Sequence, residues 1–415
     1  MSKHESRPLA VIEGASPVRL WGLTGSERLE RQLRSIGVEL CRGGADTLPP
    51  DACVIVLRGD CLYDVRVLKG LVAAPHTLLQ VDAGERSFIA AAHVTAAQAA
   101  QASEALRGAR APAAVAGAEC VPLDRVARGY DEALRKLDRP FVLPVTAENR
   151  EGLEELTFTG AYKGVTDLVT KWVWPVPARR VTRLCVRLGI TPNQVTMTGL
   201  VLAIAAGVLF AYGEFFWGLV LGWVMTFLDT VDGKLARVTV TSTQFGNIFD
   251  HGIDLIHPPL WYIAWGIGLG TERDEVSGVP LATLYVAILA GYIGGRLCEG
   301  AFQLWIARFS MFVWRPFDSF FRLIVARRNP CMILLTAGWL AGRPDLGLLA
   351  VVAWTVVSAV VLFVRVLMAA GVKLASGSVS SWLGEIGSTI SEHTLAVRVF
   401  THAAPRSGAA RGHRA

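Results

Sequence analysis

Four aspartates stand out because they lie between segments that are otherwise apolar. They are Asp229, Asp232, Asp250 and Asp254. Residues 215–228 before them and 255–270 after them have the composition of membrane-spanning helices. One carboxylate at the centre of a bilayer costs roughly 2.5–3.5 kcal/mol, so we expect a bound partner to neutralise this set. Hard oxygen ligands favour Mg²⁺ or Mn²⁺ over zinc. The pattern therefore predicts metal-assisted chemistry on a phosphate ester.

Helical spacing would bring these carboxylates together, because residues three and four apart share one face of a helix. The first face holds Asp229, Asp232 and Gly233, with Ala236 and Arg237 one turn further on. The second face holds Gly246, Asp250 and Asp254. The small residues leave room for a ligand or a neighbouring backbone. Buried salt bridges without metal are a weak alternative, because only Lys234 and Arg237 are cations close by in sequence.

The whole string, D-x2-D-G-x2-A-R-x8-G-x3-D-x3-D, resembles the signature of the CDP-alcohol phosphotransferases. Members of this family are integral membrane enzymes that move a substituted phosphate from a CDP-linked donor to an alcohol and release CMP. The stretch 191–196, TPNQVT, is similar to the motif that begins the family's first span. The resemblance extends, less specifically, to about residue 372.

The resemblance implies roles for individual residues. Asp229, Asp232 and Asp250 are expected to bind metal. Asp254 is expected to touch a metal too and to be the catalytic general base, since nearby cations would keep it ionised. The expected CDP-binding residues are Asn193, Thr196, Asp229, Gly233, Ala236, Arg237 and Gly246. Among them, Arg237 could clamp the diphosphate with two parallel hydrogen bonds.

Three more polar residues are candidate phosphate or acceptor contacts. Lys163 and Asp167 share a helical spacing with Lys171, which fits either a ladder of salt bridges or the edge of the nucleotide site. Arg296 lies within an apolar run, where an unpaired cation is expensive. It could bind a phosphate of donor or acceptor, or pair with Glu299.

The apolar runs predict an all-α transmembrane domain of six helices over residues 193–372. The runs are 194–212, 215–236, 246–269, 280–304, 331–343 and 346–371. The fifth is short for a span, so we expect it to borrow residues from 323 onward. Cations gather on one side of these runs, which places both termini in the cytosol and the protein in the inner or plasma membrane. Residues 141–192 are expected to form interfacial helices, and the Ser-, Gly- and Ala-rich tail 373–415 to be disordered.

Residues 1–140 alternate strand-like and helix-like patches, which predicts a small cytosolic α/β domain with a parallel sheet. Strands are expected at 18–22, 52–57 and 76–81, and helices at 23–37 and 90–106. This part weakly resembles a nucleotidyltransferase of the GT-A kind. It lacks the Gly-rich phosphate loop with its Arg and Lys, so we expect a structural or regulatory role. Asp60 and Asp64 fit a polar strand end and a loop better than a metal site.

Composition limits the kinds of molecule that the protein is expected to bind. The net charge is +6, but the cations follow the span ends, as attraction to anionic lipid requires, so nucleic acid is not expected as a partner. Seven cysteines include no C-x-x-C pair, which favours reduced thiols.

Several functional alternatives stay open. The donor could be CDP-diacylglycerol or a CDP-polyol such as CDP-inositol, and the acceptor inositol phosphate, glycerol phosphate or a lipid alcohol. The resemblance implies a homodimer. A cation-transporting or catalytically silent membrane protein is the alternative function, and the intact motif argues against it.

Overall fold

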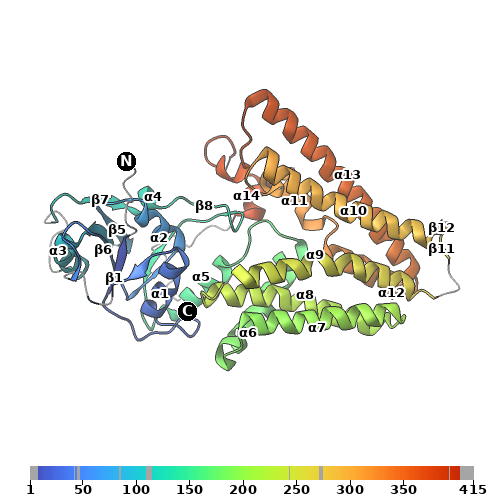
Figure 1. Ribbon diagram of the computed structural model, residues 1–415, viewed down its shortest axis with the longest axis horizontal. Coiled ribbons are helices and arrows are strands. Elements are labelled where there is room, and N and C mark those ends of the chain that lie inside the picture. Colours follow the sequence, from blue (N-terminus) through green and yellow to red (C-terminus); the bar gives the residue numbers. More distant parts are fainter. Residues whose placement is uncertain are drawn as a thin grey trace, which may run out of the picture.

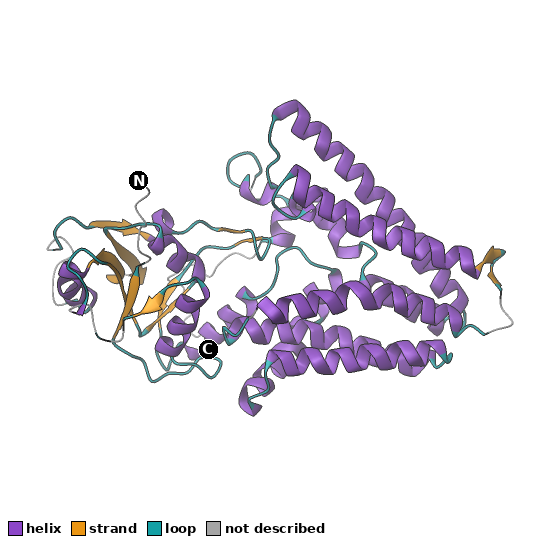
Figure 2. Ribbon diagram, viewed as in Figure 1, coloured by secondary structure: helices purple, strands orange, loops and turns teal. Residues whose placement is uncertain are grey.

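The computed structural model describes residues 8–41, 43, 47–83, 86–108, 115–242, 244–270, 274–391 and 393–401. Within α9, the side chains of 244, 245, 247 and 249–251 lie outside the described part. A sheet-containing part formed by the first third of the chain lies at one end of a part built from long helices (Figures 1 and 2). The expected architecture, a mostly helical membrane domain preceded by an α/β region, is confirmed at this level.

The N-terminal part is built on a six-stranded mixed sheet of order β2-β1-β3-β6-β5-β7. Its strands are β1 (Leu9–Glu13), β2 (Glu39–Leu40), β3 (Cys53–Arg58), β5 (Thr77–Ala83), β6 (Arg86–Thr95) and β7 (Glu119–Pro122). Strand β6 runs antiparallel to both β3 and β5, whereas the other neighbours are parallel. The predicted all-parallel sheet was therefore wrong. Small two-stranded pairs are β4 (Cys61–Tyr63) with β10 (Val142–Pro144) and β8 (Tyr130–Asp131) with β9 (Lys136–Leu137).

Strand β6 explains one error of the sequence analysis. Residues 90–106 are rich in alanine and were expected to be helical, but only α3 (Ala96–Leu106) is a helix. Ala90, Ala91 and Ala92 lie in β6 and are fully buried in the sheet. Burial between two layers here outweighs the helix propensity of alanine. Strand β1 was missed, and the strand expected at 18–22 forms only a single bridge between Leu20 and Leu23.

Three further helices pack with this sheet. They are α1 (Gly25–Ser35), α2 (Val65–Val72) and α4 (Leu123–Val126). Thr24 caps α1 in a capping box with Glu27. Asp64 caps α2 and pairs with Arg66 at 2.5 Å, and Asp60 pairs with Arg58 at 2.6 Å. Both carboxylates therefore have local structural partners.

In the second part, the predicted apolar runs fall largely within helices of the described residues. These helices are α7 (Pro192–Ala211), α8 (Phe215–Val238), α9 (Gln244–Ile267), α10 (Leu281–Ala301, continuing as Phe302–Ile306), α12 (Arg328–Leu340) and α13 (Pro344–Ser376). Helix α7 packs against α8 and α9, α10 against α13, and α12 against α8 and α13. A short hairpin of β11 (Glu275–Val276) and β12 (Val279–Pro280) lies between α9 and α10.

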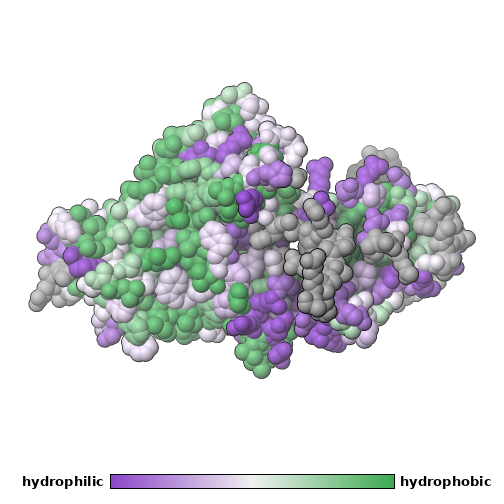
Figure 3. Space-filling model, turned by 180° about the vertical axis from the view of Figure 1, so that it is seen from behind, coloured by the Kyte–Doolittle hydropathy of each residue, from purple (hydrophilic) through white to green (hydrophobic). Residues whose placement is uncertain are grey.

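Four helices in the described part are long and apolar enough to cross a membrane: α7, α8, α10 with its extension, and α13. Helix α12 has 13 residues, about 20 Å at 1.5 Å per residue, which is short of a hydrocarbon core of about 30 Å. Residues from 323 onward do not extend this helix. They belong to a separate helix, α11 (Pro316–Ile324), and residues 325–327 between the two are not helical. On the face drawn in Figure 3, many hydrophobic residues lie on the surface of the helical part.

The connecting segment holds α5 (Arg150–Gly160), a single wide turn (Val169–Val173) and α6 (Pro175–Leu188). After α13, a turn (Trp382–Gly384) and α14 (Leu395–Phe400) pack back onto α11 and its neighbours, and Trp382 and Phe400 are fully buried. The expectation of a disordered tail from 373 is therefore wrong up to residue 401. Residues 402–415 lie outside the described part.

The sheet-containing part contacts the C-terminal end of α8. Arg28, which is 4 % exposed, donates to the carbonyl of Val238, and Arg31 Nη1 donates to the carbonyl of Thr239 at 2.8 Å. The last carbonyls of a helix have no partner within the helix, and cations there also interact favourably with the helix dipole. Helix α1 thus supplies the missing donors at the end of α8.

We predict that Arg28→Ala destabilises the folded protein by roughly 1.5–3 kcal/mol, because a charged donor to a buried carbonyl is lost. The measurement is denaturant unfolding in detergent followed by tryptophan fluorescence. Arg34→Ala is the matched control, since that side chain on the same helix is 75 % exposed. Equal effects of the two substitutions would contradict the assignment.

Candidate active site

Two of the predicted aspartates meet at a single arginine. Arg328, the first residue of α12, donates through Nη1 to Asp254 Oδ1 at 2.5 Å and through Nη2 to Asp229 Oδ2. The two carboxylates come from α9 and α8, so one guanidinium joins three helices. The Asp254 side chain is 41 % exposed, against 20 % for Asp229. Asp254 is therefore the more accessible of the two.

Asp232 lies one turn further along α8 and is 4 % exposed. Its Oδ2 accepts a hydrogen bond from Thr196 Oγ1 of α7 at 2.6 Å. Its Oδ1 is buried and has no hydrogen-bond partner within the described part of the chain. A buried carboxylate oxygen without a donor is costly. A metal cation is a partner of the right charge for this oxygen.

The fourth aspartate cannot be placed in the same detail, because the Asp250 side chain lies outside the described residues. Its backbone is in α9, one turn before Asp254, so the two share a face of that helix. Among the described side chains, no group of three His, Cys, Asp or Glu lies close enough to hold a metal ion. The structure thus joins Asp229 to Asp254 through Arg328 and holds Asp232 against α7.

The cations of the motif point elsewhere. Lys234 Nζ and Arg237 Nη1 both donate to the carbonyl of Ala161, at 3.1 and 3.2 Å. Lys234 Nζ also lies 3.6 Å from the centre of the Tyr162 ring. Neither of these cations contacts the pair of aspartates in the hydrogen bonds above. Arg328, which was not among the predicted site residues, holds that pair instead. Its only sequence signal is a basic pair, Arg327-Arg328, directly before an apolar run.

The remaining motif residues are placed unevenly. A Cβ on Gly233 would lie 3.4 Å from Arg237 Nη1, so the glycine leaves the guanidinium room over the helix. Ala236 and Gly246 are half-buried. Asn193 is exposed at the start of α7, and only Thr196 of that motif reaches an aspartate.

Asp167, in the connecting segment between α5 and α6, contacts α12. Its Oδ1 accepts from Asn329 Nδ2 at 2.9 Å and from the Thr170 backbone, and its Oδ2 accepts from Thr170 Oγ1 at 2.8 Å. Burial acts to raise the pKa of Asp167, but Arg322 and these hydrogen bonds outweigh it and lower the pKa. Lys171 Nζ donates to the carbonyl of Gly164 at 3.1 Å. The expected ladder of salt bridges through Asp167 is therefore absent from the described residues.

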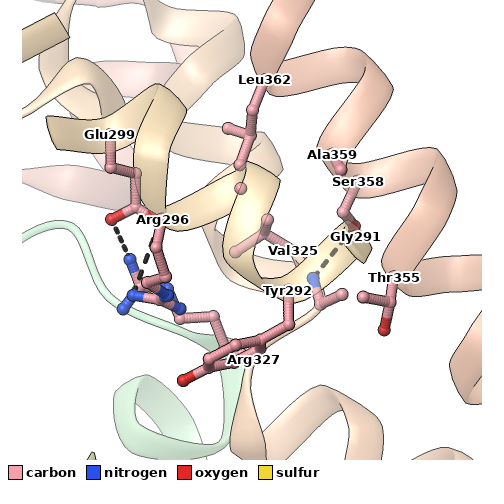
Figure 4. Close-up of a pocket in the computed structure, with 12 residues that line it drawn as sticks. Gly291, Tyr292, Arg296, Glu299, Val325, Arg327, Thr355, Ser358, Ala359 and Leu362 are labelled. Atoms are coloured by element: carbon pink, nitrogen blue, oxygen red, sulfur yellow. Dashed lines mark hydrogen bonds and ion pairs between the residues drawn. The ribbon is translucent and has the colours of Figure 1, made fainter. Parts of the chain in front are cut away.

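A second polar cluster contains more cations than acids (Figure 4). Glu299 of α10 pairs with Arg296 at 3.5 Å and, more closely, with Arg327. Pairing with Glu299 was one of the two alternatives for Arg296, and the structure contains this pair. Arg322 of α11 is close enough to act on Glu299, and its Nε and Nη1 are buried without a partner within the described residues. Burial lowers the pKa of Arg322 to about 10 and that of Arg327 to about 9.

This cluster can accommodate an anion electrostatically. Burying a guanidinium whose donors are unpaired is unfavourable, so a bound anion would stabilise the arrangement. The cavity beside Arg296 and Arg327 is small, about 10 Å³, enough for about one water molecule. Arg322 also lies near Asp167, which links this cluster to the segment beside the aspartates.

Comparison with known proteins finds similarity in the part of the chain that carries the aspartate motif. Residues 189–298 match the model of the CDP-alcohol phosphatidyltransferase family. Over 132 residues the chain is 28 % identical to the phosphatidylinositol phosphate synthase of Mycolicibacterium smegmatis, covering 31 % of this chain and 60 % of that protein. It is 37 % identical over 112 residues to the archaetidylinositol phosphate synthase of Pyrococcus horikoshii, covering 26 % and 58 %. Over 183 residues it is 28 % identical to the cholinephosphotransferase 1 of Xenopus laevis, covering 41 % and 40 %.

The chain thus spans about half the length of these relatives, between 40 and 60 %. The matched residues include α7, α8 and α9, the helices that carry Thr196 and all four aspartates of the motif. In residues 189–298, the part that carries the motif, this chain is therefore similar to the CDP-alcohol phosphatidyltransferase family.

Proposed function

We propose that the protein is an integral membrane transferase of phospholipid biosynthesis. It moves a substituted phosphate from a CDP-linked donor to an alcohol and releases CMP. The observation that carries the proposal is the meeting of Asp229 and Asp254 from two helices of the family domain, beside a buried Asp232 whose Oδ1 lacks a donor. Carboxylates in this setting fit a bound cation.

Mg²⁺ or Mn²⁺ fits the donor set, because all candidate ligands are carboxylate oxygens. Asp229, Asp232, Asp250 and Asp254 would hold the metal. When bound, it neutralises charge on the diphosphate and on the CMP leaving group. Arg237, with Gly233, Ala236 and Gly246 leaving space, would bind the CDP part, and Asn193 and Thr196 would border it.

Asp254 fits the role of general base. Its side chain is the most exposed of the three aspartates whose side chains are described, so an acceptor hydroxyl can reach it. Arg328 beside it favours the ionised carboxylate. The base must lie within hydrogen-bond reach of the proton that it removes.

We infer that the acceptor carries a phosphate. Arg322 has unpaired buried donors, and three arginines gather around Glu299, which is more positive charge than the cluster needs for itself. Two of the relatives compared are synthases of inositol phosphate lipids, which agrees with a phosphorylated polyol. A lipid alcohol would leave Nε and Nη1 of Arg322 without a partner. CDP-diacylglycerol is then the fitting donor.

The setting of the reaction is also a proposal. Six helices over 193–372, including α9 and the short α12, would form the membrane domain, with both termini cytosolic and a homodimeric assembly. The segment 141–192 would lie at the interface. The sheet-containing part, extended to Pro144 by β10, would be structural or regulatory and related to GT-A nucleotidyltransferases.

Asp254→Asn tests the base. We expect CMP release to fall by roughly 10²–10⁴-fold, the usual contribution of a general base, while the CDP-linked donor still binds. The assay uses purified protein, Mg²⁺ or Mn²⁺, labelled CDP-diacylglycerol or CDP-inositol and a panel of acceptors. Asp124→Asn, an exposed aspartate of α4, is the control. Near-normal turnover of Asp254→Asn would show that another group takes the proton.

Arg328→Gln tests whether the aspartates bind a metal, independently of activity. Without the guanidinium, Asp229 and Asp254 are left unneutralised, so the variant should be less stable in EDTA by about 3–5 kcal/mol, as for a broken buried pair. Mn²⁺ should raise its melting temperature more than that of the unchanged protein. Arg343→Gln, whose side chain is 54 % exposed, is the control. An Mn²⁺ effect no larger than in the unchanged protein would count against metal binding.

Arg322→Gln tests the acceptor. We expect the KM for a phosphorylated polyol to rise at least about tenfold, equivalent to about 1.4 kcal/mol, with the KM for the CDP-linked donor unchanged. Arg398→Gln, on the exposed side of α14, is the control. If unphosphorylated and phosphorylated acceptors lose activity equally, Arg322 does not bind the acceptor phosphate.

A further inference from the structure

A second, much larger cavity lies apart from the aspartates. It has a volume of about 460 Å³, in the range of small-molecule sites, and is formed by α5, α6 and the chain between them. Five cations line it: Lys163, Lys171, Arg179, Arg180 and Arg183. Glu155 is the one acidic residue in its lining. The cavity is therefore strongly positive.

Internal pairing leaves part of this charge unbalanced. Glu155 pairs with Arg179, and Arg183 pairs with Glu154 at 3.1 Å. Within the described residues, neither Lys163 nor Arg180 has an ion-pair or hydrogen-bond partner. The remaining cations therefore require either water or an anion in the cavity.

Two lysines of the cavity have pKa values below the ordinary value for lysine. Burial, followed by the charges of Arg135, Arg237 and Arg322, lowers the pKa of Lys163 to about 8. Burial lowers the pKa of Lys171 to about 8 as well. A bound anion would offset both effects by favouring the charged ammonium groups.

The first turn of α6 adds to the same potential. Pro175 and Val176, its first two residues, line the cavity, so the positive end of this 14-residue helix faces it. Pro175 and Pro177 have no N–H to donate, so this helix end acts on an anion mainly through the helix dipole. This end of the helix and the cations above thus favour the same kind of ligand.

One side of the cavity opens toward an apolar face of α6. Val176, Leu184 and Leu188 are 64, 51 and 64 % exposed, and Arg180 falls on the same face at four-residue spacing. A helix with an exposed apolar face and basic residues beside it lies in the membrane interface. Figure 3 shows hydrophilic residues gathered where the helical part meets the sheet-containing part, next to the hydrophobic outer surface.

We propose that this cavity binds the phosphate group of an anionic membrane phospholipid. Lys163, Lys171 and Arg180 surround the headgroup, and the acyl chains leave along Val176 and Leu184 into the bilayer. A soluble phosphate ester shares the headgroup chemistry but has no use for the apolar face. The lining of the cavity includes none of the four aspartates, and lipid binding there needs no metal, so it can be tested without the proposed transfer reaction.

The test is lipid binding by the full chain, purified in neutral detergent with EDTA and without any CDP-linked donor. Phosphatidylglycerol, phosphatidylcholine and inorganic phosphate are titrated separately, and bound lipid is counted by native mass spectrometry. Binding of inorganic phosphate is measured by the amount of bound lipid that it displaces. The variant is Lys171→Ala with Arg180→Ala. The control, Arg187→Ala with Arg34→Ala, removes the same charge from exposed positions outside the cavity.

We expect one tightly held phosphatidylglycerol, weakened at least about tenfold in the cavity variant, about 1.4 kcal/mol, and little changed in the control. Asp254→Asn should bind the lipid normally, which separates this result from a failure of the transferase proposal. Equal weakening in variant and control overturns the site. Equal retention of phosphatidylcholine also overturns it. Binding of inorganic phosphate without phosphatidylglycerol overturns the lipid assignment and assigns the cavity to a soluble phosphate ester.

Discussion

Neutralising carboxylates inside an apolar bundle is the constraint on which the rest of the helical part depends. Arg328 meets it for Asp229 and Asp254 at once, with two nitrogens of one planar group. Taking these charges out of water is expensive, and only good geometry with further hydrogen bonds offsets the cost. The break at 325–327 makes this geometry possible. It lets Arg327 turn toward Glu299 while the next residue turns toward the aspartates.

The connecting segment between the two parts keeps the other cations away from this pair. The carbonyl of Ala161 accepts from both Lys234 and Arg237, so the two cations of the motif are held on the side of α8 that faces the segment. Asp167 fixes the same segment to α12 through Asn329. The segment therefore contacts two of the three helices that carry the charged site, and a shift in it would change the surroundings of both.

The sheet-containing part contacts α5 and the end of α8. Trp21 donates through Nε1 to Thr157 Oγ1 at 2.8 Å and stacks on Phe158, so it holds α5. Arg28 and Arg31 supply donors to the end of α8. This part of the chain can thus affect the site, because helix ends left without donors fray. These contacts are the physical basis of the structural or regulatory role that we propose for the first third of the chain.

The sequence by itself determined the elements whose signals are local. Runs of apolar residues place α7 to α10 and α13, the capping box begins α1, and fixed spacing puts the aspartates on faces of α8 and α9. Tertiary structure decided what depends on contacts between distant residues. Ala90 to Ala92 became strand because two neighbouring strands offered hydrogen bonds, and the chain after α13 became ordered because Trp382 and Phe400 could be buried. The choice of Arg328 over Lys234 and Arg237 also came from packing, since charge attracts through space and not along the chain.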